Sequence, residues 1–176
     1  IERSLEVKDF KIKKHLKLIE EGIRHANELA LKLLGLGRSR EEKVSLIGVV
    51  DATLEMFKAD LDSAGIKIVK QLDEDIPDVV LDSSELRQVL INIVLNAREA
   101  MDKGGILTVK SYVKDNDTVI EIEDTGCGID NADIDKLFLP NYTTKEKGSG
   151  IGLYVSKNII ENIGGRIEVE SDLKKG

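Results

Sequence analysis

Apolar side chains recur every three or four positions between about residue 10 and residue 36, the spacing that places them on one face of an α-helix. They are Leu16, Ile19, Ile23, Ala26, Leu29, Ala30, Leu33 and Leu34. Such a face is stable only when it is buried against another helix or a second copy of itself. We therefore expect a long amphipathic helical segment over residues 1–38 that pairs or dimerises. The helix-breaking run Gly35-Leu36-Gly37-Arg38-Ser39 joins it to the rest of the chain.

Beyond this break the hydrophobic pattern changes to a mixture of helical and strand periods. Helical spacing predicts helices over residues 47–61, 83–102 and about 149–163. Short apolar or alternating runs predict strands over Ile66–Leu72, Val79–Leu81, Ile106–Val113, Thr118–Asp124 and Arg166–Ser171, with a hairpin turn at 114–117. Strands paired by hairpins with helices between them indicate an α+β fold, a two-layer α/β sandwich in which a mixed, mostly antiparallel sheet packs against helices over residues 39–176.

Composition and charge exclude several classes of function. The 176 residues include 26 Lys and Arg against 33 Asp and Glu, a net charge of −7, and only 3% aromatic residues, which disfavours general nucleic-acid binding. One cysteine, Cys127, and two histidines can form neither an internal disulfide nor a zinc cage. No apolar run approaches the roughly 20 residues of a membrane span, and the chain begins with Ile1. We therefore expect a cytoplasmic piece of a longer protein, whose parent could carry a membrane anchor.

The first candidate for chemistry is a polar edge on the helix predicted over 83–102. Asn92, Asn96 and Glu99 fall together beside its apolar stripe, because residues three or four apart share a helix face. An Asn side-chain oxygen is a neutral, hard ligand that Mg²⁺ accepts beside waters and phosphate oxygens. Asn92 and Asn96 are therefore candidate ligands for the metal of a nucleotide. Alternatively, the two amides make only local hydrogen bonds.

The second candidate is a turn that directly follows a predicted strand, with the sequence Asp124-Thr125-Gly126-Cys127-Gly128-Ile129. Ile120 and Ile122 are expected to face the core, and Asp124 continues their period-2 phase, so its carboxylate is aimed inward. An unpaired charge is costly there. The amino group of an adenine would suit the carboxylate, and Gly126 and Gly128 would let the backbone approach a flat ring. Alternatively, the acid bonds to amides of its own turn.

The third candidate is the glycine-rich segment that leads into the last predicted helix, Lys147-Gly148-Ser149-Gly150-Ile151-Gly152-Leu153. The exposed N–H groups and the dipole of a helix N-terminus attract an anion such as phosphate. Alternatively, the glycines only allow a tight start of the helix.

Just before this glycine-rich segment, a polar loop over residues 137–147 carries an aromatic anchor, two hydroxyls and two lysines. This loop is either a lid over a triphosphate or a plain surface loop.

In this order the segments resemble the four sequence boxes of the catalytic, ATP-binding domain of sensor histidine kinases, in the superfamily that also includes gyrase B, MutL and the large heat-shock chaperones. The N box is resembled by residues 86–97, the first glycine box by 124–129, the F box by 137–142 and the second glycine box by 148–153. The resemblance covers about Lys43 to Gly176. It implies a Bergerat-type ATP-binding fold, and residues 96–101 and 143–145 look most like the branch of nitrogen-regulatory sensor kinases.

The resemblance implies ATP and Mg²⁺ as cofactors and assigns roles position by position. Asn96 would coordinate Mg²⁺ with Asn92 near the metal and the phosphates, and Asp124 would accept from the adenine amino group. The glycines would shape the pocket and the hinges of the lid, and the lysines would contact phosphates. The full expected binding set is Asn92, Asn96, Asp124, Gly126, Gly128, Ile129, Thr143, Thr144, Lys145, Lys147, Gly148, Ser149, Gly150, Ile151, Gly152 and Leu153.

The resemblance also implies a reaction. Chaperone-like and repair-type relatives carry a water-activating Glu where this chain has Asn92, so hydrolysis should be poor and transfer to a protein histidine is the better interpretation. Many family members carry a basic residue where this chain has Glu99. Two other functions stay open, namely a self-sufficient ATPase with nucleotide-driven closure and a non-catalytic module for nucleotide sensing or docking.

Neither histidine of the chain has the sequence surroundings of the family's phosphoacceptor. In the family an acid follows the acceptor directly, whereas His15 is followed by Leu16 and His25 by Ala26. We therefore expect no catalytic residue in this chain, because the acceptor and the base would lie elsewhere. The implied partners are a histidine-bearing dimerisation helix, a second copy in a full-length homodimer and a response regulator.

Overall fold

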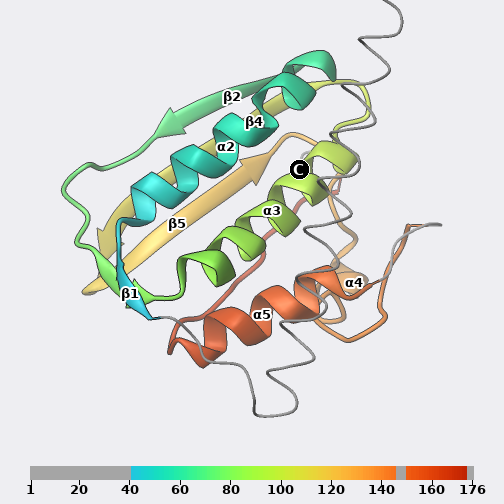
Figure 1. Ribbon diagram of the computed structural model, residues 1–176. Helices are drawn as coiled ribbons and strands as arrows, with labels where there is room; N and C mark the ends of the chain where they lie inside the picture. Colours follow the sequence, from blue (N-terminus) through green and yellow to red (C-terminus); the bar gives the residue numbers. More distant parts are fainter. Residues whose placement is uncertain (1–40, 146–149, 174–176) are drawn as a thin grey trace, which may run out of the picture. The chain divides into compact units, whose positions relative to one another are not determined.

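The computed structural model describes residues 41–145 and 150–173. The helical segment predicted over residues 1–38 lies outside the described residues, so it stays a prediction, as does the domain boundary that follows it. The elements are β1 (Glu42–Val44), α2 (Leu46–Ser63), β2 (Ile66–Gln71), β3 (Val79–Leu81), α3 (Ser83–Ala100), β4 (Gly105–Lys114), β5 (Asp117–Asp124), α4 (Asn131–Ile134) and α5 (Gly152–Asn162) (Figure 1). The helices predicted over 47–61 and 83–102 are confirmed as α2 and α3.

The strands form two separate sheets. β2 pairs in parallel with β4, which pairs antiparallel with β5, and β1 pairs antiparallel with β3 in a separate two-stranded sheet. The predicted hairpin is confirmed between β4 and β5, where Asp115 and Asn116 take φ angles of 51° and 71°. Asn and Asp tolerate the left-handed conformation that a tight hairpin turn requires. The predicted mixed, mostly antiparallel strand arrangement is therefore confirmed.

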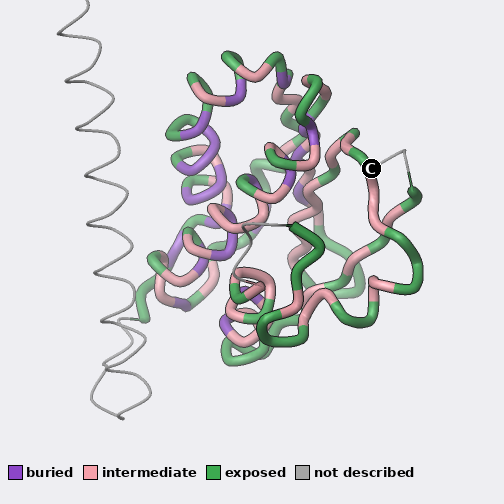
Figure 2. Tube along the Cα trace, turned by 90° about the vertical axis from the view of Figure 1, so that its right-hand side faces the viewer, coloured by how far each residue is buried: buried purple, intermediate pink, exposed green. Residues whose placement is uncertain are grey.

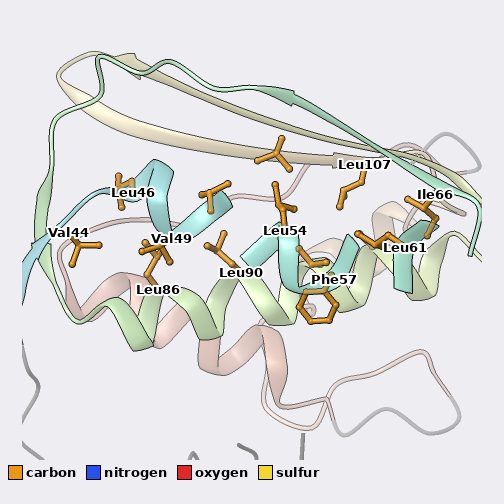
Figure 3. Packing of buried hydrophobic residues seen from close by; sticks show 14 of the residues in the cluster. Val44, Leu46, Val49, Leu54, Phe57, Leu61, Ile66, Leu86, Leu90 and Leu107 are labelled. Carbon is orange, nitrogen blue, oxygen red and sulfur yellow. The ribbon is translucent and has the colours of Figure 1, made fainter. Parts of the chain in front are cut away.

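Helices α2 and α3 cover one face of the three-stranded sheet and enclose the core (Figure 1). Leu54 and Leu61 of α2 meet Leu107 of β4 on the sheet side, and all three are at most 2% exposed. Leu86 and Leu90 of α3 join the same cluster from the other helix (Figure 3). Most of the buried residues lie on α2, α3 and β4 (Figure 2). Since α5 packs against α3, α3 contacts both the core and the last helix.

The starts of α3 and α5 follow from local chemistry. Asp82 caps α3 because its Oδ1 accepts from Ser84 N–H at 2.9 Å. The helix α5 begins at Gly152, later than the predicted start near residue 149, and the φ of 65° at Gly150 explains the difference. A residue in the left-handed region cannot belong to a right-handed helix. None of the described helices has the length and apolar character needed to cross a membrane.

The prediction of a strand over Arg166–Ser171 is wrong. This segment belongs to neither sheet, although its residues alternate between exposed and half-buried as the pattern indicated. Arg166 lies 3.4 Å from Asp117 at the start of β5, and Ser171 Oγ accepts from Ile129 N–H at 2.9 Å beyond the end of β5. The alternation therefore identified a backbone with one sheltered face, but a strand also needs backbone partners, which the alternation does not specify.

Candidate functional site

Three of the predicted motifs meet along α3. Asn92 contacts the start of α5, Asn96 contacts Lys145 of the loop, and Ala100 contacts the turn that follows β5. The last contact is a hydrogen bond of 3.2 Å from Cys127 N–H to the Ala100 carbonyl. Because the three contacts lie about one helical turn apart, the C-terminal half of α3 forms one edge of the candidate site.

The side-chain amide of Asn92 holds α5 against α3. Its Nδ2 donates to the Gly152 carbonyl and to Ser156 Oγ, both at 3.2 Å, and Ser156 is 0% exposed. Because a carbonyl oxygen only accepts, the atom that faces Gly152 has to be the amide nitrogen. Both amide hydrogens are then used within the protein, and Oδ1 is the atom left for a metal or a phosphate-bound water. The metal role of Asn92 stays a prediction, beside this packing role.

We expect Ser156→Ala to lower the free energy of unfolding by about 1 kcal/mol, because it removes one acceptor from a part-buried hydrogen bond. Chemical denaturation of the two chains measures this difference. Ser63→Ala is the matched control, since the Ser63 hydroxyl donates to the Asp60 carbonyl at 2.8 Å in an exposed position. The control should change the free energy of unfolding by less than about 0.5 kcal/mol. Equal losses in both variants would contradict the packing role.

Asn96 and Glu99 share one cationic partner. Lys145 Nζ lies 3.0 Å from Asn96 Oδ1 and 2.5 Å from Glu99 Oε2. The end of the loop is held in a turn by a hydrogen bond of 3.1 Å from Lys145 N–H to Thr143 Oγ1. Asn96 therefore holds a cation through the same oxygen that a metal ion would use. The residues present at this position fit a hard cation such as Mg²⁺.

The Asp124 carboxylate makes a hydrogen bond within its own turn. Its Oδ1 accepts from Gly126 N–H at 2.8 Å, which is the local bond that the alternative interpretation expected. Ile120 and Ile122 pack against the core as predicted, and Asp124 follows them in phase and is half-buried. No other hydrogen bond from the described residues reaches the Asp124 carboxylate, so its second oxygen remains able to accept from a ligand. The adenine role of Asp124 stays a prediction.

Glycines of both glycine boxes lie in close contact with neighbouring residues. A Cβ at Gly126 would lie 2.7 Å from Ala100 Cβ and 2.7 Å from Asp124 Oδ1. A Cβ at Gly150 would lie 2.5 Å from the carbonyl carbon of Asn141. Real Cβ atoms do not approach that closely, so a larger residue would force these segments apart. The glycines thus allow the turn after β5 to lie on the end of α3, and the segment before α5 to lie on the loop.

Two aromatic side chains anchor the loop between α4 and α5. Lys157 Nζ of α5 lies 5.3 Å from the ring centroid of Phe138, a cation–π contact. Lys136 Nζ lies 5.9 Å from the ring centroid of Tyr142, and a hydrogen bond with Asp133 raises the pKa of the Tyr142 hydroxyl. The predicted aromatic anchor is confirmed. The role of the loop as a lid stays a prediction.

Some of the other predicted residues lie in the described part of the chain, and some lie outside it. Thr144 lies in the loop, and Ile151 and Leu153 lie at the start of α5. Lys147, Gly148 and Ser149 lie outside the described residues. No hydrogen bond between described residues joins Asp124 to Asn96 or Lys145, so the two sides of the site are connected through α3. Sequence reasoning missed Ser156, although its spacing of four residues from Gly152 places both on one face of α5.

Known proteins share both the sequence pattern and the fold. A family model described as histidine kinase-, DNA gyrase B-, and HSP90-like ATPase matches residues 81–176. The chain is 31% identical over 166 residues to sporulation kinase D of Bacillus subtilis, covering 92% of this chain and 33% of that protein. It is 34% identical over 161 residues to the signal transduction histidine-protein kinase AtoS of Escherichia coli, covering 89% of this chain and 26% of that protein. The chain thus spans about a third or less of the length of these relatives.

A solved structure confirms the fold class. The catalytic domain of histidine kinase ThkA, in a nucleotide-free form, matches with a TM-score of 0.70 and 27% identity over 77% of this chain and 90% of that chain. The predicted α+β sandwich is therefore confirmed, while the placement in the nitrogen-regulatory branch stays a prediction. The family model covers more than half of the chain. The chain therefore belongs to the family of histidine kinase-, DNA gyrase B-, and HSP90-like ATPases, in its sensor histidine kinase group.

Proposed function

We propose that residues 39–176 bind ATP with Mg²⁺ and position the γ-phosphate for transfer to a histidine on a dimerisation helix. The observation that carries this proposal is the shared edge of α3, where Asn96 meets Lys145 and Asn92 meets the start of α5. A metal ligand, a phosphate-binding lysine and a helix N-terminus are what a triphosphate requires. Family membership supports the same assignment.

The adenine end of the nucleotide would lie at the turn that follows β5. There one oxygen of Asp124 accepts from Gly126 N–H, and the second oxygen would accept from the ligand. An amino group of adenine is a donor that matches this acceptor. Because Cys127 N–H bonds to the Ala100 carbonyl, the turn is fixed to the same helix that carries Asn96. This connection would set the distance between the adenine and phosphate ends of the site.

The protein's own contribution to the reaction is positioning and electrostatic stabilisation. Asn96 would hold the metal ion, which supplies charge neutralisation at the phosphates, and Lys145 would add a second positive charge. The side chain at position 92 is an amide, which cannot take a proton from water at neutral pH. Its two donated hydrogen bonds also hold it against α5. We therefore expect slow hydrolysis and efficient transfer only when an acceptor histidine is supplied in line.

The partners follow from the same proposal. Sensor histidine kinases act as dimers on a histidine-bearing helix and pass the phosphoryl group to a response regulator. We assign this chain the same partners, a homodimeric parent protein and a response regulator, and the predicted cytoplasmic location. The net charge of −7 supports the exclusion of nucleic acid as a partner.

A phosphotransfer assay tests this function. The chain is incubated with γ-labelled ATP, Mg²⁺ and an isolated dimerisation segment from a sensor histidine kinase relative, together with the same segment carrying Gln in place of its acceptor histidine. We expect an acid-labile label on the intact segment and none on the substituted segment. Steady phosphate release without an acceptor would favour the self-sufficient ATPase. Nucleotide binding with neither label nor release would favour the sensing module.

A further inference from the structure

The edge of α3 presents two oxygen ligands to a single cation. Glu99 follows Asn96 by three residues, so both side chains lie on one face of the helix. Asn96 Oδ1 and Glu99 Oε2 both contact Lys145 Nζ, at 3.0 Å and 2.5 Å. One of these oxygens is neutral and the other is anionic. The pair is therefore a small cation site, filled in this structure by an ammonium group.

The donor set is the one that Mg²⁺ prefers. Magnesium in nucleotide sites is usually held by one or two carboxylates together with phosphates and waters, and Glu99 supplies a carboxylate at this position. No group of three His, Cys, Asp or Glu side chains surrounds a metal-sized space in the described residues. The phosphates of the nucleotide would therefore complete the coordination, so that the metal and the nucleotide bind together.

We propose, on the basis of the proposed function, that Glu99 is a second protein ligand of the nucleotide-bound metal ion, directly or through a water. In the nucleotide-free chain the ammonium of Lys145 takes the metal position. Two cations cannot share Asn96 Oδ1 at contact distance, because they repel each other. Binding of the metal and the nucleotide therefore displaces Lys145, whose ammonium is then available to the phosphates.

The exchange is easy because the Lys145–Glu99 ion pair is exposed. The side chain of Lys145 is 40% exposed and that of Glu99 is 51% exposed, and exposed pairs contribute little to stability.

The Glu99 carboxylate also makes the site prefer the metal-bound form of the nucleotide to the metal-free form. A metal-free triphosphate meets the negative charge of Glu99, whereas a metal-bound one is attracted by it. Glu99 therefore makes tight nucleotide binding dependent on the metal.

The Glu99→Gln variant tests this role through binding, without any measurement of turnover. Calorimetric titration with a non-hydrolysable ATP analogue is repeated at increasing Mg²⁺ concentrations for the unchanged and the variant chain. We expect the Mg²⁺ concentration for half-maximal binding to rise about tenfold in the variant, with no loss of affinity for the metal-free analogue. Glu55→Gln is the matched control, because Glu55 is also paired with a lysine, Lys58 at 3.8 Å, and lies on α2. It should leave both values unchanged.

Repeating Glu99→Gln in a chain that already carries Lys145→Met separates a metal role of Glu99 from an effect through Lys145. If Glu99 acts only by holding the ammonium, Glu99→Gln will have no effect in a chain that already carries Lys145→Met. We expect the increase in Mg²⁺ requirement to persist in that chain. An unchanged Mg²⁺ requirement in both backgrounds, with normal binding by the unchanged chain, would overturn the role of Glu99 and leave the proposed function intact. Absence of nucleotide binding by the unchanged chain would overturn both.

Discussion

Asp124→Asn should weaken the binding of an ATP analogue about a hundredfold, the cost of losing a hydrogen bond to a charged group. Gly126 N–H donates to the side chain of residue 124 at 2.8 Å, so the amide oxygen of the variant has to take that position. The amide nitrogen is then left facing the adenine amino group, and two donors oppose each other. Calorimetry measures the change in affinity, and the melting temperature reports whether the fold is kept.

Asp130→Asn is the matched control for this substitution. Asp130 Oδ1 accepts from Ala132 N–H at 2.9 Å, which is the same kind of local bond two residues ahead, and Asp130 lies outside the proposed site. Asn is an equally good helix cap, so this variant should bind nucleotide as the unchanged chain does. Equal affinity of the two variants would contradict the assignment of Asp124 to the adenine.

Gly126→Ala should destabilise the fold and abolish nucleotide binding together. The new Cβ would lie 2.7 Å from Ala100 Cβ and 2.9 Å from the Ala100 carbonyl carbon, so the turn after β5 has to move away from α3. Overpacking of this kind costs about 1–3 kcal/mol in the free energy of unfolding. The same Cβ would lie 2.7 Å from Asp124 Oδ1, which displaces the carboxylate. Denaturation and calorimetry on one sample measure both effects.

Gly48→Ala is the matched control for Gly126→Ala, because Gly48 has space for a Cβ. A Cβ at Gly48 meets only Ser45, at 3.5 Å, which is an ordinary contact. Because Gly48 lies in α2, the alanine should stabilise the chain by up to about 1 kcal/mol and leave nucleotide binding unchanged. If Gly126→Ala were as stable as the unchanged chain, the close packing of the turn against α3 would be contradicted.

Much of the fold was predictable because hydrophobic periodicity reports local conformation. The period of 3.6 identified α2 and α3, and the period of 2 identified β4 and β5, including the turn at Asp115 and Asn116. The same reasoning failed for Arg166–Ser171, where the alternation is present but the segment joins no sheet. Periodicity shows which face of a segment is sheltered. It does not show which other segment provides the hydrogen-bond partner.

The candidate site was predictable to the extent that its residues lie close in sequence. The shared edge of Asn92, Asn96 and Glu99 follows from helical spacing alone, and the phase of Asp124 follows from its strand. The hydrogen bond from Asn92 to Ser156 and the contact of Lys145 with Glu99 join residues that are 64 and 46 positions apart. Such contacts depend on how α5 and the loop pack on α3, which no local pattern specifies.

A calorimetric titration of the unchanged chain with a non-hydrolysable ATP analogue, with and without Mg²⁺, tests whether α3 carries a nucleotide site. We expect one site per chain, tighter binding when Mg²⁺ is present, and loss of that Mg²⁺ effect in Asn96→Ala, which removes the oxygen that holds a cation. Circular dichroism of the same samples confirms that each chain is folded. A folded chain without nucleotide binding, or an Asn96→Ala chain with an undiminished Mg²⁺ effect, would contradict the assignment of the site to α3.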